Sequence, residues 1–446
     1  MPSAARRPLA RPRVSPDPGD AARLRRAERR YQVEIRRNLN RNFIIHLVHG
    51  MLGQTGFRLI NAPTFLPAYI LLLSGSDVAV GVALALQALG MAITPLIGAN
   101  RIEHRSRVLP AAISTGGTTR ISILGMGLTG LVFDPPVALW LMFFWLTLFG
   151  LSQGMQGVIF NYLMSKLIPV SKRGRLTGLR NFLAGIIAAG VALAGGHYFL
   201  GEHPDATGYS YTFLLSFVLT MIGLFALSFT REPEQPSVRP QRSLRHGLGE
   251  IPTLLRDDPA FTRYFIARAL ATLGRMALPF YILHAGSGMT LTGANLGILT
   301  MAFTLAGTFS NLLWGNLGDR RGFRLVYLAS IALWVASTVL LLLADGLLFS
   351  ILVFTGIGAA VQGFQNAAQN LTLEFGHRND LPMRIAIANT ASELAGTIGP
   401  LVGGVIAATL GYPALFLVSI AFLAAGGLMV ALQVPEPRRR GAGHGD

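Results

Sequence analysis

The chain has 446 residues, of which 51% are hydrophobic and only 13% are charged, and its formal net charge is +17. Soluble domains carry about 25% charged residues, so this composition excludes an ordinary soluble protein and favours an integral membrane protein. The absence of cysteine excludes disulfides and thiolate metal sites, and no other metal or cofactor is predicted. The basic residues lie in short segments between apolar runs, which indicates membrane topology rather than nucleic-acid binding.

The first 41 residues are rich in arginine and proline and lack the apolar core of a signal peptide. Residues 21–37 are compatible with a basic helix at the surface of an anionic membrane. A solvated, partly unstructured cytoplasmic tail is the alternative interpretation of this segment.

Twelve apolar segments follow, each long enough to supply the about 20 residues that a membrane-spanning helix requires. Turn-forming residues or charges interrupt the chain between them. The expected spans are 43–73, 77–99, 108–132, 137–164, 176–200, 210–230, 262–286, 293–315, 325–344, 347–373, 385–409 and 413–433.

The basic residues orient these spans. If the connections alternate between the two sides of the membrane, and if Arg180 and Arg263 near span ends are counted with the connections, all but four of the 38 lysines and arginines fall on the side of both termini. Basic connections mark the cytoplasmic side, so both termini are expected there. The strong preference for arginine over lysine indicates a GC-rich bacterial genome, and hence the inner membrane of a bacterium.

The longest connection divides the chain into two sets of six spans. Leu66-Pro67-Ala68-Tyr69-Ile70 also corresponds to Leu278-Pro279-Phe280-Tyr281-Ile282, which indicates a duplicated half. The expected units are a basic tail (1–41), a six-helix bundle (42–230), a central loop (231–261), a second bundle (262–434) and a C-terminal tail (435–446).

A glycine-rich, charged loop connects spans eight and nine. It reads Gly315-Asn316-Leu317-Gly318-Asp319-Arg320-Arg321-Gly322-Phe323-Arg324, and residues 98–107 form a weaker copy in the first half. The pattern resembles the G-x-L-a-D-R-x-G-R signature of the major facilitator superfamily. That resemblance implies an all-α membrane protein of two six-helix, pseudo-symmetric bundles that transports a solute by alternating access.

In that family the loop braces one half of the protein against another helix in one transport state. The resemblance carries this gating role to residues of both copies; a generic basic turn is the alternative. The residues concerned are Gly315, Gly318, Asp319, Arg320, Gly322 and Arg324 in the second half, and Glu103 and Arg105 in the first.

Span eleven contains small residues around a proline. The run Gly396, Gly399, Pro400, Gly403 and Gly404 resembles a glycine–proline motif of the family's antiporters. That motif indicates drug–proton exchange when it lies in span five, whereas here it lies in span eleven. It is therefore interpreted as a hinge or a site of close helix packing.

Charged residues inside the expected spans are the candidate functional residues, because burying a charge in hydrocarbon is costly unless it faces a wet cavity or a partner. Arg58 and Arg275 are suited to bind an anionic group through the guanidinium fork; alternatively, one of them pairs with Glu393. Glu393 is the candidate proton-coupling residue, whereas Arg120 and Arg268 are interpreted as structural. The candidate polar partners of the solute are Gln54, Asn61, Gln156, Gln362 and Asn366.

These features predict a secondary active transporter, not an enzyme, that moves a small organic solute of anionic or amphipathic character. Its expected partners are the solute, protons and the lipid bilayer, and a monomer is expected. A multidrug-type efflux pump is the near alternative. A membrane receptor or assembly factor of the same fold, which transports nothing, is the alternative from another class.

Overall fold

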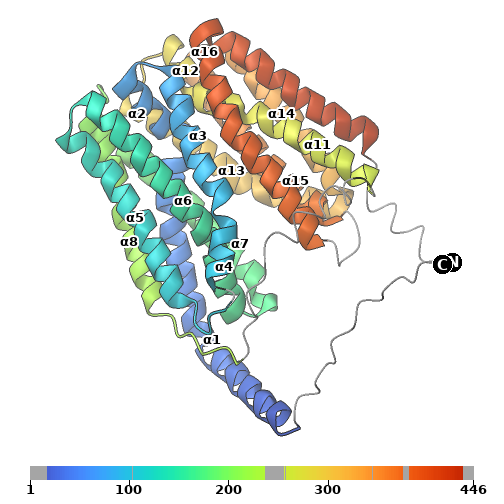
Figure 1. Cartoon of the computed structure of the whole chain (residues 1–446). Coiled ribbons are helices and arrows are strands. Elements are labelled where there is room, and N and C mark those ends of the chain that lie inside the picture. The colour runs from blue at the N-terminus through green and yellow to red at the C-terminus, as the bar shows by residue number, and fades with distance from the viewer. Residues whose placement is uncertain are drawn as a thin grey trace, which may run out of the picture.

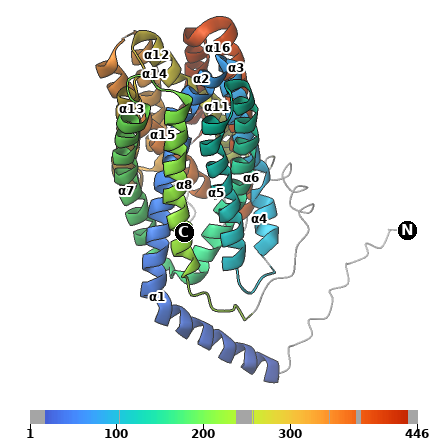
Figure 2. The same cartoon turned by 90° about the vertical axis from the view of Figure 1, so that its left-hand side faces the viewer.

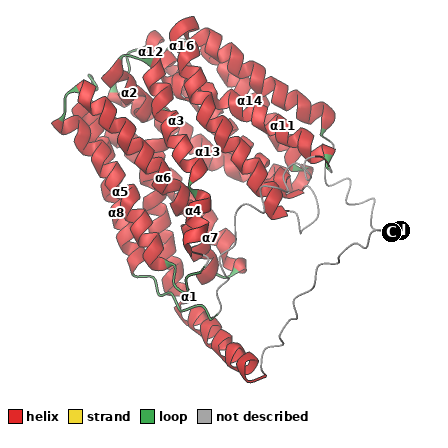
Figure 3. Cartoon of the chain, in the orientation of Figure 1, coloured by secondary structure: helices red, strands yellow, loops and turns green. Residues whose placement is uncertain are grey.

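The computed structural model describes residues 18–102, 104–236, 256, 258–343, 345–374 and 381–434. Every regular element within these ranges is a helix (Figure 3). Glu103, most of the expected central loop and the expected C-terminal tail lie outside the described residues.

The first half of the chain forms one bundle of helices, which Figure 1 shows in blue to green. Its elements are α1 (Pro18–Asn61), α2 (Phe65–Ser74), α3 (Asp77–Ile93), α4 (Pro95–Ile102), α5 (Leu109–Val132), α6 (Pro135–Leu167), α7 (Val170–Gly195), the π-helical turn η1 (Gly196–Leu200) and α8 (Ala206–Ser228).

The second half forms a second bundle beside the first, shown in yellow to red (Figure 1). Its elements are α11 (Pro259–Leu273), the 3-10 segment η2 (Gly274–Phe280), α12 (Tyr281–Gly288), α13 (Gly293–Arg321), α14 (Phe323–Leu343), α15 (Leu347–Glu374) and α16 (Leu381–Gln433).

Among the described residues, nine helices are long and apolar enough to cross a membrane, and the bent pair α1 and α2 makes ten. The pair is bent by 41° around Pro63, which has no N–H to donate to a helical hydrogen bond. Helix α16 covers the last two expected spans, which meet at Gly411 with a φ of 82°. Helix α5 coincides with the remaining expected span, so the structure is consistent with twelve.

The basic N-terminal segment is helical from Pro18 onward and continues without a break into the first span. This agrees with the helical interpretation of residues 21–37. Figure 2 shows the first part of α1 running obliquely beyond the end of the bundle.

The two bundles are in close backbone contact at the end that carries Gly75, Gly201 and Gly411. Helix α3 packs against α16 there, and α7 packs against α13. A Cβ atom at Gly81 would lie 2.4 Å from the carbonyl oxygen of Pro400, a distance that real Cβ atoms do not show. Only glycine therefore allows α3 and α16 to approach this closely.

Hydrogen bonds reinforce this contact between the halves. The N–H of Gly293 donates to the carbonyl of Gly201 (2.7 Å), and the hydroxyl of Tyr412 donates to Asp77 Oδ1 (2.8 Å). The helices of the two halves diverge toward the opposite end, where the basic residues lie (Figure 1). The protein is thus closed at one end and splayed at the basic end.

A buried carboxylate organises the basic end of the first half. Glu232 follows α8 and forms an ion pair with Lys166 at 2.8 Å, with side-chain exposures of 2% and 3%. It also accepts hydrogen bonds from the backbone N–H groups of Val108 (2.8 Å) and Leu109 (2.7 Å) at the start of α5. One side chain therefore ties together the start of α5, the end of α6 and the segment after α8.

We expect Gly81→Val to open the closed end, because overpacking a close contact costs about 1–3 kcal/mol. This cost should lower the population of the conformation in which α3 and α16 are in contact about tenfold or more. The chain has no native cysteine, so spin labels at Leu72→Cys and Leu410→Cys report the separation of α2 and α16. The label distance should shift to longer values in the valine variant. Gly117→Val is the matched control, since nothing lies within 4 Å of its Cβ position; an unchanged distance in both variants contradicts the assignment.

Candidate functional site

A cavity of about 670 Å³ lies between the two bundles. Helices α1, α3 and α7 of the first half and η2, α13, α15 and α16 of the second contribute to its wall. The charged side chains among the described lining residues are Arg58, Arg180, Arg275 and Glu393. With all four ionised, the cavity therefore has an excess of positive charge.

Arg58 lies in the last turn of α1, where the free carbonyl groups of a helix end favour a cation. Its Nη1 donates to Thr308 Oγ1 of α13 (2.9 Å), and its Nη2 donates to the carbonyl of Asn181 (3.3 Å). Arg58 therefore joins the two halves at the cavity wall, with part of its hydrogen-bonding capacity already used.

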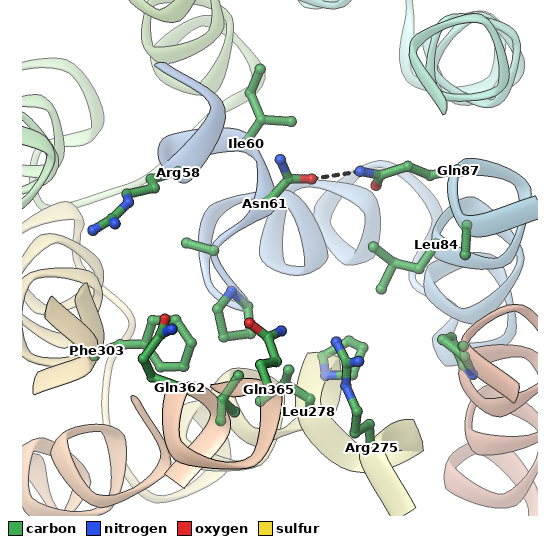
Figure 4. A pocket seen from close by; sticks show the side chains of 18 of the residues that line it. Arg58, Ile60, Asn61, Leu84, Gln87, Arg275, Leu278, Phe303, Gln362 and Gln365 are labelled. Atoms are coloured by element: carbon green, nitrogen blue, oxygen red, sulfur yellow. Dashed lines mark hydrogen bonds between the residues drawn. The ribbon is translucent and has the colours of Figure 1, made fainter. Parts of the chain in front are cut away.

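Arg275 lies in η2, on the other side of the cavity from Arg58 (Figure 4). In the described part of the chain its guanidinium donates no hydrogen bond to the protein. It interacts electrostatically with Glu393 of α16, but the two side chains are not paired within 4.0 Å. The N–H groups of Arg275 and the carboxylate of Glu393 are therefore free to contact a solute or water.

Amide side chains cover much of the remaining wall. Gln87 Nε2 donates to Asn61 Oδ1 (2.6 Å), and Asn61 Nδ2 donates to the carbonyl of Phe57 (2.9 Å). Gln362 and Gln365 of α15 lie across the cavity from this pair (Figure 4). Such amides can both donate to and accept from a polar solute.

Most of the candidate residues from the sequence lie together. Those that line the cavity are Gln54, Arg58, Asn61, Arg275, Gln362 and Glu393.

Two candidates lie elsewhere. Gln156 is 7% exposed, and its Oε1 accepts hydrogen bonds from Thr119 (3.0 Å) and Arg120 (3.1 Å). Asn366 donates to Asn311 Oδ1 at 3.0 Å. The structure therefore places both amides in helix-to-helix contacts and not among the residues that line the cavity.

Arg120 is fully buried among the helices of the first half. It donates to the carbonyl groups of Thr220 (3.3 Å) and Gly116 (3.1 Å) and to Gln156, and its guanidinium lies 5.1 Å from the ring centroid of Phe57. Neutral oxygens and an aromatic face replace part of the water that this charge gives up, while its Nη2 has no hydrogen-bond partner among the described residues. These contacts fit a structural role.

Arg180 is a cavity residue that the sequence did not single out, because it was counted with the basic connections. Helix α7 begins at Val170, so ten residues at 1.5 Å rise place Arg180 about 15 Å along the helix. Its side chain is only 9% exposed, lies 5.7 Å from the ring centroid of Phe160 and lines the cavity. Helix α7 begins six residues before the expected span 176–200, so Arg180 lies well inside the helix and not in the connection that precedes it.

The predicted loop at residues 315–324 is largely helical. Helix α13 continues to Arg321, and Gly322 ends it with a φ of 90°. Arg324 then donates to the carbonyl groups of Val430 (3.3 Å) and Ala431 (2.6 Å) of α16. The expectation of a ten-residue loop is therefore wrong, and the gating role of these residues and of Arg105 stays a prediction.

The glycine–proline run of α16 lies in close helix contacts. A Cβ atom at Gly404 would lie 2.7 Å from the carbonyl oxygen of Asp77, and one at Gly403 would lie 2.9 Å from that of Met276. Gly399 also faces Met276 at ordinary contact distance, while Gly396 has open space. Helix packing against α3 and η2 therefore accounts for most of this run.

Comparison with known proteins identifies the fold. Two overlapping stretches, residues 43–292 and 264–445, match the family model of the Major Facilitator Superfamily. The chain belongs to this family. The family that the charged loop predicted is thereby confirmed, and the protein is a membrane transporter of the major facilitator type.

Solved structures share this fold at low identity. A mutant of the nucleoside transporter NupG has a TM-score of 0.68 at 14% identity, over 87% of this chain and 98% of that chain. A D-xylose–proton symporter has a TM-score of 0.68 at 15% identity, over 89% of this chain and 98% of that chain. No curated protein sequence matches the chain.

We expect Gln156→Leu to lower the free energy of unfolding by about 1–3 kcal/mol, because it removes an acceptor from the buried guanidinium of Arg120. Reversible unfolding in mixed detergent micelles measures this change. Gln365→Leu is the matched control, since Gln365 lines the open cavity. Equal stability of the two variants would contradict the structural role of Gln156.

Proposed function

We propose that this transporter moves a small organic anion by alternating access through the cavity between its two bundles. The observation that carries the proposal is the charge of the wall. Among the described lining residues, Arg58, Arg180 and Arg275 face a single carboxylate, Glu393. A neutral solute would leave this excess of positive charge uncompensated in a site surrounded by hydrocarbon. An anionic solute compensates it.

The two halves make different contributions to anion binding. Arg58 is already hydrogen-bonded to Thr308 and Asn181, so it supplies mainly a fixed positive charge. Arg275 donates no hydrogen bond to any described residue, and a guanidinium can form two parallel hydrogen bonds with a carboxylate or phosphate. We therefore assign direct contact with the anionic group to Arg275 and polar contacts with the rest of the solute to Gln54, Asn61 and Gln362.

Glu393 supplies a means of coupling transport to protons. When ionised, it competes with the solute anion for the positive charge of Arg275; when protonated, it releases that charge to the solute. Binding of a proton and binding of an anion therefore favour each other, as thermodynamic linkage requires. The sign corresponds to co-transport of anion and proton, with tighter anion binding at lower pH.

The charged connections orient the proposed cycle. Basic residues mark the cytoplasmic side of a membrane protein, so the splayed end faces the cytoplasm and the structure corresponds to an inward-facing state. A bacterial inner membrane, cytoplasmic termini and a monomeric transporter remain parts of this proposal. The carboxylate Asp319 and the arginines beside it lie at the same end and carry the proposed gating role.

Arg275→Gln should weaken binding of the anion about 10- to 100-fold, because it removes a charge-assisted hydrogen bond. A panel of mono- and dicarboxylates, phosphate esters, nucleosides and pentoses is first tested by thermal shift of the purified protein. Arg263→Gln, on an exposed part of α11 outside the cavity, is the matched control. Stabilisation by nucleosides or pentoses alone would indicate that the substrate is a neutral hydroxylated solute and not an anion. Unchanged affinity in Arg275→Gln would overturn the assignment of Arg275 as the residue that contacts the anionic group.

Glu393→Gln should bind the anion at least as well as the wild type but lose the dependence of binding on pH, because the carboxylate no longer competes for Arg275. In proteoliposomes, an imposed pH gradient should drive accumulation of the solute in the wild type and not in this variant, while exchange of labelled for unlabelled solute continues. Accumulation that survives the substitution would exclude Glu393 as the coupling residue. Absence of any flux across the panel would favour a receptor or assembly factor, and flux of hydrophobic drugs alone would favour an efflux pump.

A further inference from the structure

A second hollow lies outside the transport cavity, at the basic end of the first half. It is a groove of about 880 Å³ between the first part of α1 and the segment Arg231–Pro236 that follows α8. Tyr31 lies in its wall. Its charged lining residues are Arg23, Arg26, Arg30, Glu34, Arg107, Arg231, Glu232 and Glu234.

The arginines of α1 form one stripe. Arg23, Arg26 and Arg30 are separated by three and four residues, a spacing that places them on one face of a helix. Glu34 continues the stripe one turn further along. Arg231 adds a fourth guanidinium from the opposite wall of the groove.

The carboxylates on that opposite wall are already engaged. Glu232 is paired with the buried Lys166 and accepts from the backbone at the start of α5. Glu234 is paired with Arg107 at 3.3 Å. Among the described residues, Arg23, Arg26, Arg30 and Arg231 form no ion pair within 4.0 Å, so four positive charges face the groove against the single remaining carboxylate of Glu34.

Hydrogen bonds hold this opposite wall in place. Asn42 Nδ2 donates to the carbonyl of Arg231 (3.0 Å), and the N–H of Arg231 donates to Asn42 Oδ1 (3.1 Å). Arg41 donates to the carbonyl of Phe229 at 3.1 Å, and Tyr162 donates to Gln235 Oε1 at 3.2 Å. The groove is therefore built by two segments that are locked together at their membrane ends.

The position of the groove favours a ligand from the bilayer. Helix α8 ends at Ser228, and the apolar part of α1 begins at about residue 43, so both walls emerge from the membrane next to one another. The first part of α1 then runs obliquely to the bundle (Figure 2), so its arginine stripe does not project straight away from the end of the bundle. Anionic lipid headgroups are concentrated at the membrane surface and attract clustered basic residues.

We propose that this groove binds the phosphate headgroup of an anionic phospholipid. The four guanidinium groups, which form no ion pair with any described residue, supply forked donors that match phosphate oxygens, and Tyr31 lies in the same wall. Because the segment with Arg231 also carries Glu232, a bound lipid holds in place the ion pair that joins α5, α6 and the end of α8. The lipid therefore stabilises the first bundle from outside the transport pathway.

The test uses the delipidated full chain in a neutral detergent, titrated with phosphatidylglycerol or phosphatidylcholine and followed by native mass spectrometry and thermal shift. Wild-type protein should retain phosphatidylglycerol and gain thermal stability from it, with little response to phosphatidylcholine. The triple variant Arg23→Gln, Arg26→Gln and Arg30→Gln should bind phosphatidylglycerol at least about tenfold more weakly. Arg231→Gln should weaken it in the same direction from the other wall.

The matched control is the triple variant Arg29→Gln, Arg36→Gln and Arg37→Gln, which removes the same charge from the same helix but from residues outside the groove. It should bind phosphatidylglycerol as the wild type does. If both triple variants weaken phosphatidylglycerol binding equally, the binding arises from the overall charge of the helix, and the proposal of a specific site in the groove is overturned. Inorganic phosphate or pyrophosphate that displaces phosphatidylglycerol and gives the same stabilisation would assign the groove to a soluble phosphate instead of a lipid.

Discussion

The close backbone contact between the two halves at their closed end is the constraint on which the rest of the structure depends. Gly81 lies against the Pro400 carbonyl, and Gly293 is hydrogen-bonded to Gly201. Helices in a bilayer gain nothing from hiding apolar surface from water, so close packing through small residues supplies their association. Sealing one end through glycine leaves the other end splayed, and the cavity is the space between.

The charges inside this fold show that burial of an arginine does not by itself decide whether its role is structural or functional. Arg120 and Arg275 both lie in expected membrane spans. Arg120 is enclosed by carbonyl groups, Gln156 and the ring of Phe57, which replace most of its hydration but leave its Nη2 without a hydrogen-bond partner among the described residues. Arg275 lines the cavity, donates no hydrogen bond within the described part of the chain and has a carboxylate nearby. The surroundings therefore separate a structural charge from one that is available to a solute.

Pairs of opposite charge are arranged differently at the basic end of the first half and in the cavity between the halves. At the basic end, Lys166 and Glu232 are in direct contact and almost completely buried, and the surrounding backbone completes their hydrogen bonds. In the cavity, Arg275 and Glu393 interact at longer range without forming a contact pair. The contact pair resists opening because each charge would be left buried alone, whereas the separated pair can exchange partners with a solute or a proton.

The sequence by itself determined the membrane class and the family fold, and its twelve expected spans are consistent with the helices, because apolar length and the placement of arginine are local features of the chain. It also marked Arg58, Arg275 and Glu393, since charges are rare in such spans. Only the tertiary structure separated Gln156 and Asn366 from the cavity, added Arg180 to it and extended α13 through the expected loop. Those outcomes depend on how far each helix continues and which face it turns to its neighbours, and such information resides in the packing between helices.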